Sequence, residues 1–298
     1  MLLATVLLAL RFTVRDAYHL PAWIYYFFGL APLIAALYAA SGVVALLAQR
    51  RRPAVASFAM AAAVFAGWVG SAYHHITCEH RGDAVRVVTW NLSRLRDGAD
   101  RVVADLQSLD PDIALLVETG HDNREAREFW EKSFADHEIV FAGGGIVVMA
   151  RGEVGEPESG SLAGISSYAT LDVSVRGQAF HVMVVDLDAS PRFDKRQLVP
   201  EVFRIASETN TNARALIVAG DFNTPIFSPV FIDVRQRFVN AFEAAGSGLH
   251  ATWPSRFPLT AIDHIWTRKN IEVGCSRLFT SPASDHRAVV ADVWPVSR

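Results

Sequence analysis

A run of 28 residues without a charged side chain, Pro21 to Ala48, restricts most strongly what this chain can fold into. A second uncharged run extends from Ala54 to Tyr73. A helix needs about 20 apolar residues to cross the hydrocarbon core of a bilayer, and such runs are costly to keep in water. We therefore expect two transmembrane helices, about 21–48 and 54–73, rather than a helical hairpin buried in a soluble protein.

Charged residues beside these runs predict how the chain lies in a lipid bilayer. Arg50, Arg51 and Arg52 separate the runs and should face the cytoplasm by the positive-inside rule. We therefore expect a multi-pass protein of the bacterial inner (plasma) membrane whose remaining residues are extracytoplasmic. The apolar residues 1–19, interrupted by Arg11, predict either a short first span or a partly inserted segment.

Composition changes after the second run. Of 28 Lys and Arg and 31 Asp and Glu, five arginines and one aspartate lie in 1–78, which leaves 23 basic and 30 acidic residues, a net charge of −7, in 79–298. We expect a membrane anchor over 1–77 and a globular domain over 78–298, joined by the polar linker His74–Asp83. The acidic domain disfavours nucleic acid as a partner, and the sequence does not indicate the oligomeric state.

Both cysteines, Cys78 and Cys275, fall in the part expected outside the cytoplasm. An oxidising compartment would permit a disulfide between them. The sequence gives no distance between the two side chains, and we expect two separate thiols.

Strand-like and helix-like segments alternate after the linker, which predicts an α/β domain with mixed sheets. The expected strands are Val85–Leu92, Ile113–Thr119, Gly143–Arg151, Ala179–Leu187, Ala213–Asn223, Ala261–Arg268, Ile271–Phe279 and Arg287–Trp294. The expected helices are Gly98–Asp112, Asn123–Phe134, Asp194–Thr209 and Phe227–Gly246.

Polar side chains recur at the ends of these strands, where α/β sheets commonly bind ligands. Alternate strand positions point the same way, so Asp221 and Asn223 should face one site while Phe222 enters the core. Carboxylates, amides and a histidine suit Mg²⁺ or Mn²⁺ better than zinc, and such a site can attack a phosphate ester. The recurring polar residues are Asn91, Glu118, Asp221, Asn223, Asp263, His264, Asp285 and His286.

The motifs "TWN", "VET", "GDFNTP", "IDHIW" and "SDHRAVVADV", in this order and spacing, resemble the endonuclease/exonuclease/phosphatase superfamily, which includes DNase I and the sphingomyelinases. The resemblance covers Ala84 to Val296. With the apolar N-terminal runs and the "TWP" before "IDHIW", the chain looks like a membrane-anchored bacterial branch of that family. The resemblance implies a four-layer α/β sandwich of two packed mixed β-sheets, with the site at one edge between them.

The resemblance also implies three residues at a metal ion. Glu118 matches the principal Mg²⁺ ligand, and Asn91 matches the amide that borders the metal and orients the catalytic aspartate. Asp285 matches an acid near the metal. Ser93 stands where some members have an acid, so we expect no metal contact from it.

Four further residues match catalytic positions of the family. Asp221 matches the carboxylate that handles the proton of the water or the leaving group, and Asn223 matches an amide donor to the phosphate oxygens. His286 matches the catalytic histidine at the scissile phosphate, and Asp263 matches the carboxylate that orients it. Asp186 stands where many members have a histidine, which implies that this chain handles its substrate differently.

Other residues carry no expected chemistry. The glycines Gly143–Gly145 predict a strand turn, since no phosphate-loop motif follows them. His264 should pack behind the site, and His137 should lie on the surface or in a linker. Trp253 could stack on a substrate or fill the core, and we expect it to fill the core.

These patterns predict a Mg²⁺-dependent phosphoric ester hydrolase at the outer membrane face. Only about ten residues join the last expected membrane helix to the first expected strand, and fully extended they reach roughly 35 Å, so we expect a lipid-linked phosphate ester as substrate. One alternative is a membrane-tethered endonuclease or exonuclease. Another is a catalytically silent, membrane-anchored binding module, which would need none of the matched site residues.

Overall fold

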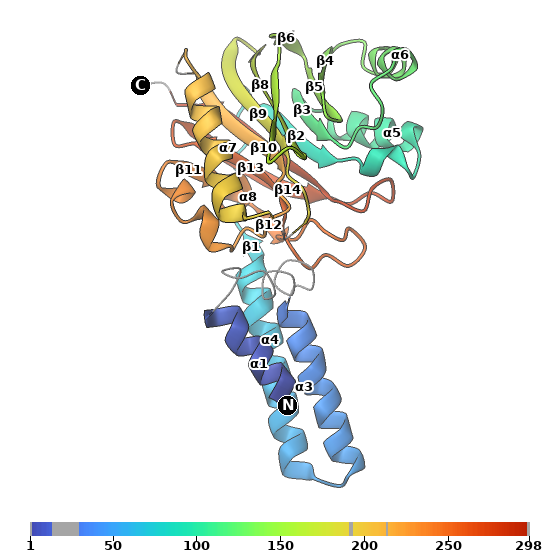
Figure 1. The fold of residues 1–298 in the computed structure, drawn as a ribbon, viewed down its shortest axis with the longest axis vertical. Helices are drawn as coiled ribbons and strands as arrows, with labels where there is room; N and C mark the ends of the chain where they lie inside the picture. The colour runs from blue at the N-terminus through green and yellow to red at the C-terminus, as the bar shows by residue number, and fades with distance from the viewer. Residues whose placement is uncertain (1, 14–29, 191–192, 213, 297–298) are drawn as a thin grey trace. The chain divides into compact units, whose positions relative to one another are not determined.

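The computed structural model describes residues 2–13, 30–190, 193–212 and 214–296 (Figure 1). The chain divides into two compact units, Met1–His74 and His75–Arg298. The described part of the first unit is mainly helical, and the second unit is a mixed α/β domain.

Three helices of the first unit are described, α1 (Leu2–Thr13), α3 (Leu30–Leu47) and α4 (Arg51–Ala72). Helices α3 and α4 pack against each other at Gly42, where a Cβ would lie 2.9 Å from the Phe58 ring. Among the described residues, α4 is the one helix long and apolar enough to cross a membrane, and α3 contains a shorter apolar helix. The described helices therefore do not support the expected multi-pass arrangement. Residues 14–29, which belong to the expected spans in part, lie outside the described residues.

Two mixed sheets form the second unit. The strands of the first sheet are β2 (Val85–Asn91), β3 (Ile113–Val117), β4 (Glu138–Gly143), β5 (Ile146–Ala150), β14 (Ile271–Phe279) and β15 (Ala288–Pro295). Those of the second sheet are β6 (Gly152–Val154), β7 (Glu158–Leu162), β8 (Ser166–Val175), β9 (Gln178–Asp186), β10 (Ala215–Asp221), β11 (Phe238–Asn240) and β13 (Asp263–Arg268). The first sheet has the order β14-β15-β2-β3-β5-β4, and the second has the order β11-β13-β10-β9-β8-β6, with β7 paired to β8. Two short strands, β1 (Tyr73–His75) and β12 (Ser247–Leu249), belong to neither sheet.

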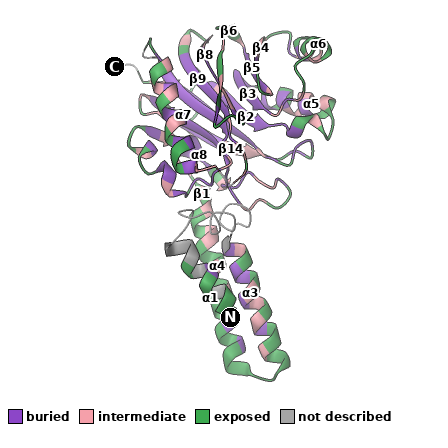
Figure 2. Cartoon of the chain, in the orientation of Figure 1, coloured by how far each residue is buried: buried purple, intermediate pink, exposed green. Residues whose placement is uncertain are grey.

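Helices cover the outer faces of both sheets (Figure 1). Helices α5 (Ala99–Leu109) and α6 (Arg124–Ser133) lie on the first sheet, and α7 (Lys195–Thr209) lies on the second. The buried strands stand out between the exposed sides of these helices in Figure 2. This arrangement confirms the expected four-layer α/β sandwich of two packed mixed sheets.

The alternation of side chains along β10 explains how one strand serves two cores. Ile217 and Ala219 join the core between the two sheets, while Leu216 and Val218 join the core under α7. Gly220, with φ of +133°, follows them, and a Cβ there would lie 2.0 Å from Val185 O. Because β9 and β10 approach so closely just before β10 ends, only glycine fits at this position.

The expected helix over Phe227–Gly246 is wrong. That segment instead contains two 3₁₀ turns, η2 (Pro229–Phe231) and η3 (Val234–Gln236), then β11 and a short helix, α8 (Ala241–Ala245). Apolar residues three or four positions apart give this segment the hydrophobic pattern of a helix. In the structure, however, β11 pairs with β13 at the edge of the second sheet. The Asn240 side chain then accepts from the backbone of α8 and begins a new helix.

The sequence also missed the polar strands β6, β7 and β8, which form one edge of the second sheet. β8 carries Ser, Thr and Asp among its apolar residues, so its alternation is weak in the sequence. The glycine turn was correct, since β4 and β5 form a hairpin across Gly144 and Gly145.

The expectation of two separate thiols is wrong as well. Cys78 and Cys275 form a disulfide, with Cα atoms 4.5 Å apart. The backbone explains the proximity: Glu79 N donates to Gly274 O at 2.7 Å, so the segment before β2 runs beside β14. The two cysteines are 197 residues apart in the sequence, so the sequence alone could not predict that they lie close together.

Candidate active site

Three aspartates lie in one row across neighbouring strands of the second sheet. Asp186 of β9 pairs in register with Asp221 of β10, which pairs in register with Asp263 of β13. The inner-face neighbours in the same strands, two residues before Asp186 and Asp221 and two residues after Asp263, lie in the core between the sheets. Because strand side chains alternate with a period of two, the aspartates continue that inner face, which therefore becomes acidic at its end.

The first sheet brings an amide and a carboxylate to this row. Asn91 ends β2, and its Nδ2 donates to Glu118 Oε1 and to Asp221 Oδ2, each at 3.0 Å. Its Oδ1 accepts from Ser93 N at 2.9 Å, which fixes the amide so that Nδ2 faces both carboxylates. Glu118 follows β3 with φ of +49°, a left-handed conformation that ends the strand alternation at this residue.

His286 and Asp263 form a buried pair. His286 Nδ1 lies 3.0 Å from Asp263 Oδ2 and 3.9 Å from Asp221 Oδ2. Burial lowers the pKa of His286, but the attraction and hydrogen bond of Asp263, with the attraction of Asp221 and Asp285, outweigh burial and raise the pKa to about 10. The imidazole is therefore protonated at neutral pH, and its Nδ1–H donates to Asp263.

Two carboxyl groups of the row hold protons more tightly than an ordinary aspartate. Burial and the repulsion of Asp263 raise the pKa of Asp221 well above its usual range. Burial and the repulsion of Glu118 raise the pKa of Asp186 to about 7. Crowded acids with displaced pKa values are typical of active sites.

Asn223 reaches the site by a turn and not by strand alternation, which corrects the expectation. β10 ends at Asp221, and Asn223 has φ of +43°. Asn223 N donates to Asp221 Oδ1 at 2.7 Å, and its Nδ2 donates to Leu187 O at 2.7 Å. Phe222, by contrast, enters the core as expected, and His264 packs against its ring.

Asp285 lies at the outer side of the site, where sequence reasoning missed two of its partners. The Ser93 hydroxyl donates to Asp285 Oδ1, and Trp253 Nε1 donates to Oδ2 at 3.3 Å. Burial raises the pKa of Asp285, but the Ser93 hydrogen bond and the attraction of His286 outweigh burial and lower it. Trp253 is only partly buried, so the expectation that it fills the core is wrong.

The oxygen donors of the site fit a hard divalent cation. Glu118 and Asp285 each offer a carboxylate, and Asn91 Nδ2 donates to Glu118 Oε1. The Glu118 side chain keeps 30% of its surface exposed and makes one ion pair, with Arg94 at 3.4 Å, so lone pairs remain open. Possible ligand atoms of Asp221, Asp263 and His286 also lie within 4.8 Å of one another. In that group, however, His286 Nδ1 already makes a hydrogen-bond contact with Asp263. Oxygen ligands of this kind suit Mg²⁺ or Mn²⁺.

The burial of two further histidines, His264 and His137, can be compared with what the sequence predicted. His264 is buried behind the site, as expected, and Nε2 donates to Thr224 O at 2.9 Å. His137 was expected on the surface or in a linker, but its side chain is 1% exposed. It contacts Pro111 O and Asp136, which lie on either side of it.

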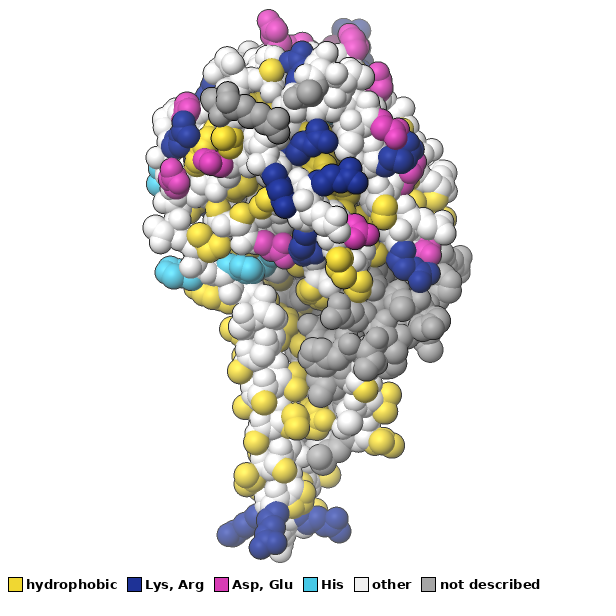
Figure 3. All heavy atoms as spheres, turned by 90° about the vertical axis from the view of Figure 1, so that its left-hand side faces the viewer, with side chains coloured by type: hydrophobic (Ala, Val, Ile, Leu, Met, Phe, Trp, Pro, Cys, Tyr) yellow, Lys and Arg dark blue, Asp and Glu magenta, His cyan; other side chains and the backbone are white. Residues whose placement is uncertain are grey.

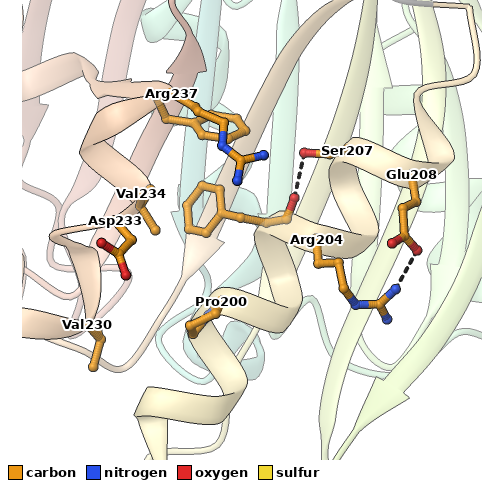
Figure 4. Close-up of a pocket in the computed structure, with 10 residues that line it drawn as sticks. Pro200, Arg204, Ser207, Glu208, Val230, Asp233, Val234 and Arg237 are labelled. Carbon is orange, nitrogen blue, oxygen red and sulfur yellow. Dashed lines mark hydrogen bonds and ion pairs between the residues drawn. The ribbon is translucent and has the colours of Figure 1, made fainter.

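A separate pocket of about 340 Å³ lies between α7 and the η2–η3 segment (Figure 4). Phe203 and Phe238 form part of its lining, with Arg204, paired to Glu208, and Arg237 among its charged residues. None of the expected site residues lines it. The pocket is therefore distinct from the acidic site described above.

Solved structures of similar fold come from several organisms. An endonuclease/exonuclease/phosphatase from Bacteroides vulgatus is 17% identical, with a TM-score of 0.59 over 71% of this chain and 99% of that chain. A mannosyl-6-phosphatase from Bacteroides thetaiotaomicron is also 17% identical, with a TM-score of 0.58 over 70% and 99%. TDP2 from D. rerio, complexed with single-strand DNA product, is 16% identical, with a TM-score of 0.56 over 71% and 99%. Identities this low show the shared fold alone.

A search of curated proteins finds no match to this chain. The sequence model of the Endonuclease/Exonuclease/phosphatase family, however, matches residues 88–286, which run from β2 to the His286 of the acidic site. The match covers about two thirds of the chain and spans all the residues placed in the site above. The chain therefore belongs to the endonuclease/exonuclease/phosphatase family.

Proposed function

We propose that this chain is a membrane-tethered, metal-dependent phosphoric ester hydrolase. Its proposed catalytic residues are Asp221, His286, Asn223, Asp263 and Asn91. The observation that carries the proposal is the buried contact of His286 Nδ1 with Asp263 Oδ2 at 3.0 Å, beside the buried Asp221. Burying like charges together costs free energy, so a binding module would gain nothing from this arrangement.

The proposed chemistry follows from the contacts of each group. Glu118 and Asp285 would hold Mg²⁺ or Mn²⁺, which would supply positive charge to the phosphate ester, and Asn91 would border the ion by fixing Glu118 through Nδ2. Asp221 would take the proton of the attacking water as a carboxylate, whose Oδ2 accepts from Asn91 Nδ2 at 3.0 Å and lies 3.9 Å from His286 Nδ1. His286 donates to a phosphate oxygen through Nε2, because Asp263 already holds Nδ1.

Membrane tethering rests on α4. The helix has 22 residues, and 17% of its most apolar window is buried, whereas the core helix of a soluble protein is mostly buried. The disulfide between Cys78 and Cys275 supports an extracytoplasmic domain, since disulfides persist in oxidising compartments. With Arg50–Arg52 on the cytoplasmic side, α4 would lead outward.

A lipid-linked phosphate ester is the substrate that we propose. The segment between α4 and β2 is short, so a lipid headgroup is always within reach of the tethered domain. The net charge of −7 over residues 79–298 disfavours long polyanions. On the face drawn in Figure 3, basic and acidic side chains of the second unit lie interspersed.

The second candidate is a tethered nuclease, which the DNA-bound TDP2 structure of similar fold favours. The same fold also occurs in a mannosyl-6-phosphatase, so substrates differ widely within it. The full chain in vesicles, with Mg²⁺, should therefore be assayed in parallel on lipid phosphates, sugar phosphates, single-stranded DNA and duplex DNA. Phosphate release from lipid should exceed every other activity. Efficient DNA cleavage with every lipid phosphate untouched would favour the nuclease instead.

Variants test the assigned roles in the same assay. Asp221→Asn and His286→Ala should each lower turnover about 10²-fold or more, as lost acid–base and electrostatic groups do. The exposed residues Asp233 and His121 provide matched controls, Asp233→Asn and His121→Ala, which should keep wild-type turnover. Unchanged turnover in His286→Ala, with an unchanged melting temperature, would mean that the assigned roles are wrong.

A further inference from the structure

Lys195, at the start of α7, is buried although no step of the proposed chemistry uses it. The chain has three lysines, and the other two, Lys132 and Lys269, are exposed. Lys195 keeps 4% of its surface exposed, and its Nζ donates to Asp188 O. A lysine is rarely buried this far unless it is paired, because burial removes water from the ammonium group.

The segment that Lys195 contacts is the one that follows Asp186. Leu187 N donates to Asp221 O at 2.9 Å, and Leu187 O accepts from Asn223 Nδ2 at 2.7 Å. The next carbonyl, Asp188 O, accepts from Lys195. The carbonyl oxygens of Leu187 and Asp188 thus accept hydrogen bonds from the Asn223 side-chain amide and from the buried Lys195 ammonium group, respectively.

Lys195 adds a cation to a region of the chain that is rich in carboxyl groups. The aspartate row and Glu118 contribute four carboxyl groups, and the nearby cations besides Lys195 are His286 and the largely exposed Arg94. The Lys195 ammonium is attracted by Asp221, Asp188 and Asp186, although burial outweighs this and lowers its pKa to about 8. It therefore remains largely charged at neutral pH.

We infer that Lys195 is a positioning residue of this active site. Its ammonium group holds the Asp186–Asp188 segment against the end of β10 and supplies buried positive charge beside Asp186 and Asp221. Through Leu187, this fixes Asn223 and the backbone of Asp221 in place. The catalytic consequence rests on the proposed function, whereas the positioning itself does not.

Hydrogen exchange measured by mass spectrometry tests the positioning without any substrate. In the full chain, Lys195→Met should speed exchange of the Leu187 and Asp188 amides about tenfold or more, because both are hydrogen-bonded in place. Amides of β2 should exchange as in the wild type. Lys195→Arg keeps the charge and should change exchange little, and Lys132→Met is the matched control. Equal exchange in Lys195→Met and Lys132→Met would overturn the inference.

Kinetics on the best substrate then separate positioning from binding. Lys195→Met should lower kcat and kcat/KM by a similar factor, about 30-fold, since the transition state and not the bound substrate loses its alignment. Lys195→Arg should recover most of that loss. A rise in KM alone would contradict positioning and indicate direct substrate binding.

A double-mutant cycle with Asp186→Asn tests the charge relationship. If Lys195 offsets the Asp186 carboxylate, the variant carrying both Lys195→Met and Asp186→Asn should lose less activity than the product of the two single losses. Independent losses would overturn the countercharge role. Should Lys195→Met fail to fold, Lys195→Gln takes its place in both experiments. An inactive wild type would refute the proposed function, while hydrogen exchange would still decide the inference.

Discussion

Asn91 Nδ2 donates to Asp221 Oδ2 at 3.0 Å, and this bond joins the last residue of β2 in the first sheet to the last residue of β10 in the second. The same amide donates to Glu118 Oε1. One side chain thus holds the proposed metal ligand and the proposed base at a fixed separation.

Replacing Asn91 should therefore disturb both functions together. Asn91→Ala removes two buried donors, and we expect turnover to fall about 10²-fold and Mg²⁺ activation to weaken. Steady-state kinetics over a Mg²⁺ titration measure both effects. Asn212→Ala, at an exposed position, is the control. A variant with normal turnover and only a lower melting temperature would reduce Asn91 to a structural role.

Glu118 should govern the metal requirement. Glu118→Gln keeps the shape but removes a charged ligand, so half-maximal activity should need about tenfold more Mg²⁺. Titration of activity against Mg²⁺ checks this. Glu125→Gln, on the exposed side of α6, should leave the titration unchanged. If half-maximal activity of Glu118→Gln needs the same Mg²⁺ concentration as the wild type, other residues of the site would have to hold the metal.

His264 should make the fold sensitive to acid. Burial lowers its pKa from 6.5 to about 4, so between these values the unfolded chain binds a proton that the folded chain does not. Stability should be fully present above pH 6.5 and fall with pH below it, by about 3 kcal/mol in total at the low end. Urea unfolding near pH 7 and pH 4.5 should show a smaller loss for His264→Gln than for the wild type. His121→Gln, at an exposed histidine, should behave as the wild type does.

The disulfide should stabilise the second unit. It closes a loop of 197 residues, so removing it should cost about 5 kcal/mol. Reductant should lower the melting temperature of the wild type but not that of the Cys78→Ala, Cys275→Ala double variant. Identical melting of the oxidised and reduced wild type would show that the bond does not constrain the unfolded chain.

The sequence predicted much of the site because its residues end apolar strands. Asn91, Asp221 and Asp263 each stand where a buried strand stops or begins, and such positions can be recognised from hydrophobic patterns alone. Asn223 was assigned for the wrong reason, because its left-handed backbone cannot be read from residue type. Lys195 could not be found at all, because a lysine near a helix start is usually exposed and its burial depends on the packing of β9.

The secondary structure, like the site, was predicted correctly in some segments and missed in others. Strands with continuous apolar runs, such as β3 and β10, were predicted within a few residues. The polar edge strands were missed because their stability comes from pairing with a neighbour rather than from their own composition. Phe227–Gly246 failed because apolar spacing alone cannot separate a helix from successive turns that bury the same side chains.

The meeting of two sheets at one site has a further consequence for the life of the chain. Asn91, Glu118 and His286 belong with the first sheet, whereas Asp186, Asp221 and Asp263 belong to the second. A nascent or damaged chain in which one sheet has formed alone would carry only half of the proposed catalytic residues. On the proposed function, hydrolysis would begin only once the sandwich has closed, which makes folding itself a safeguard against premature action.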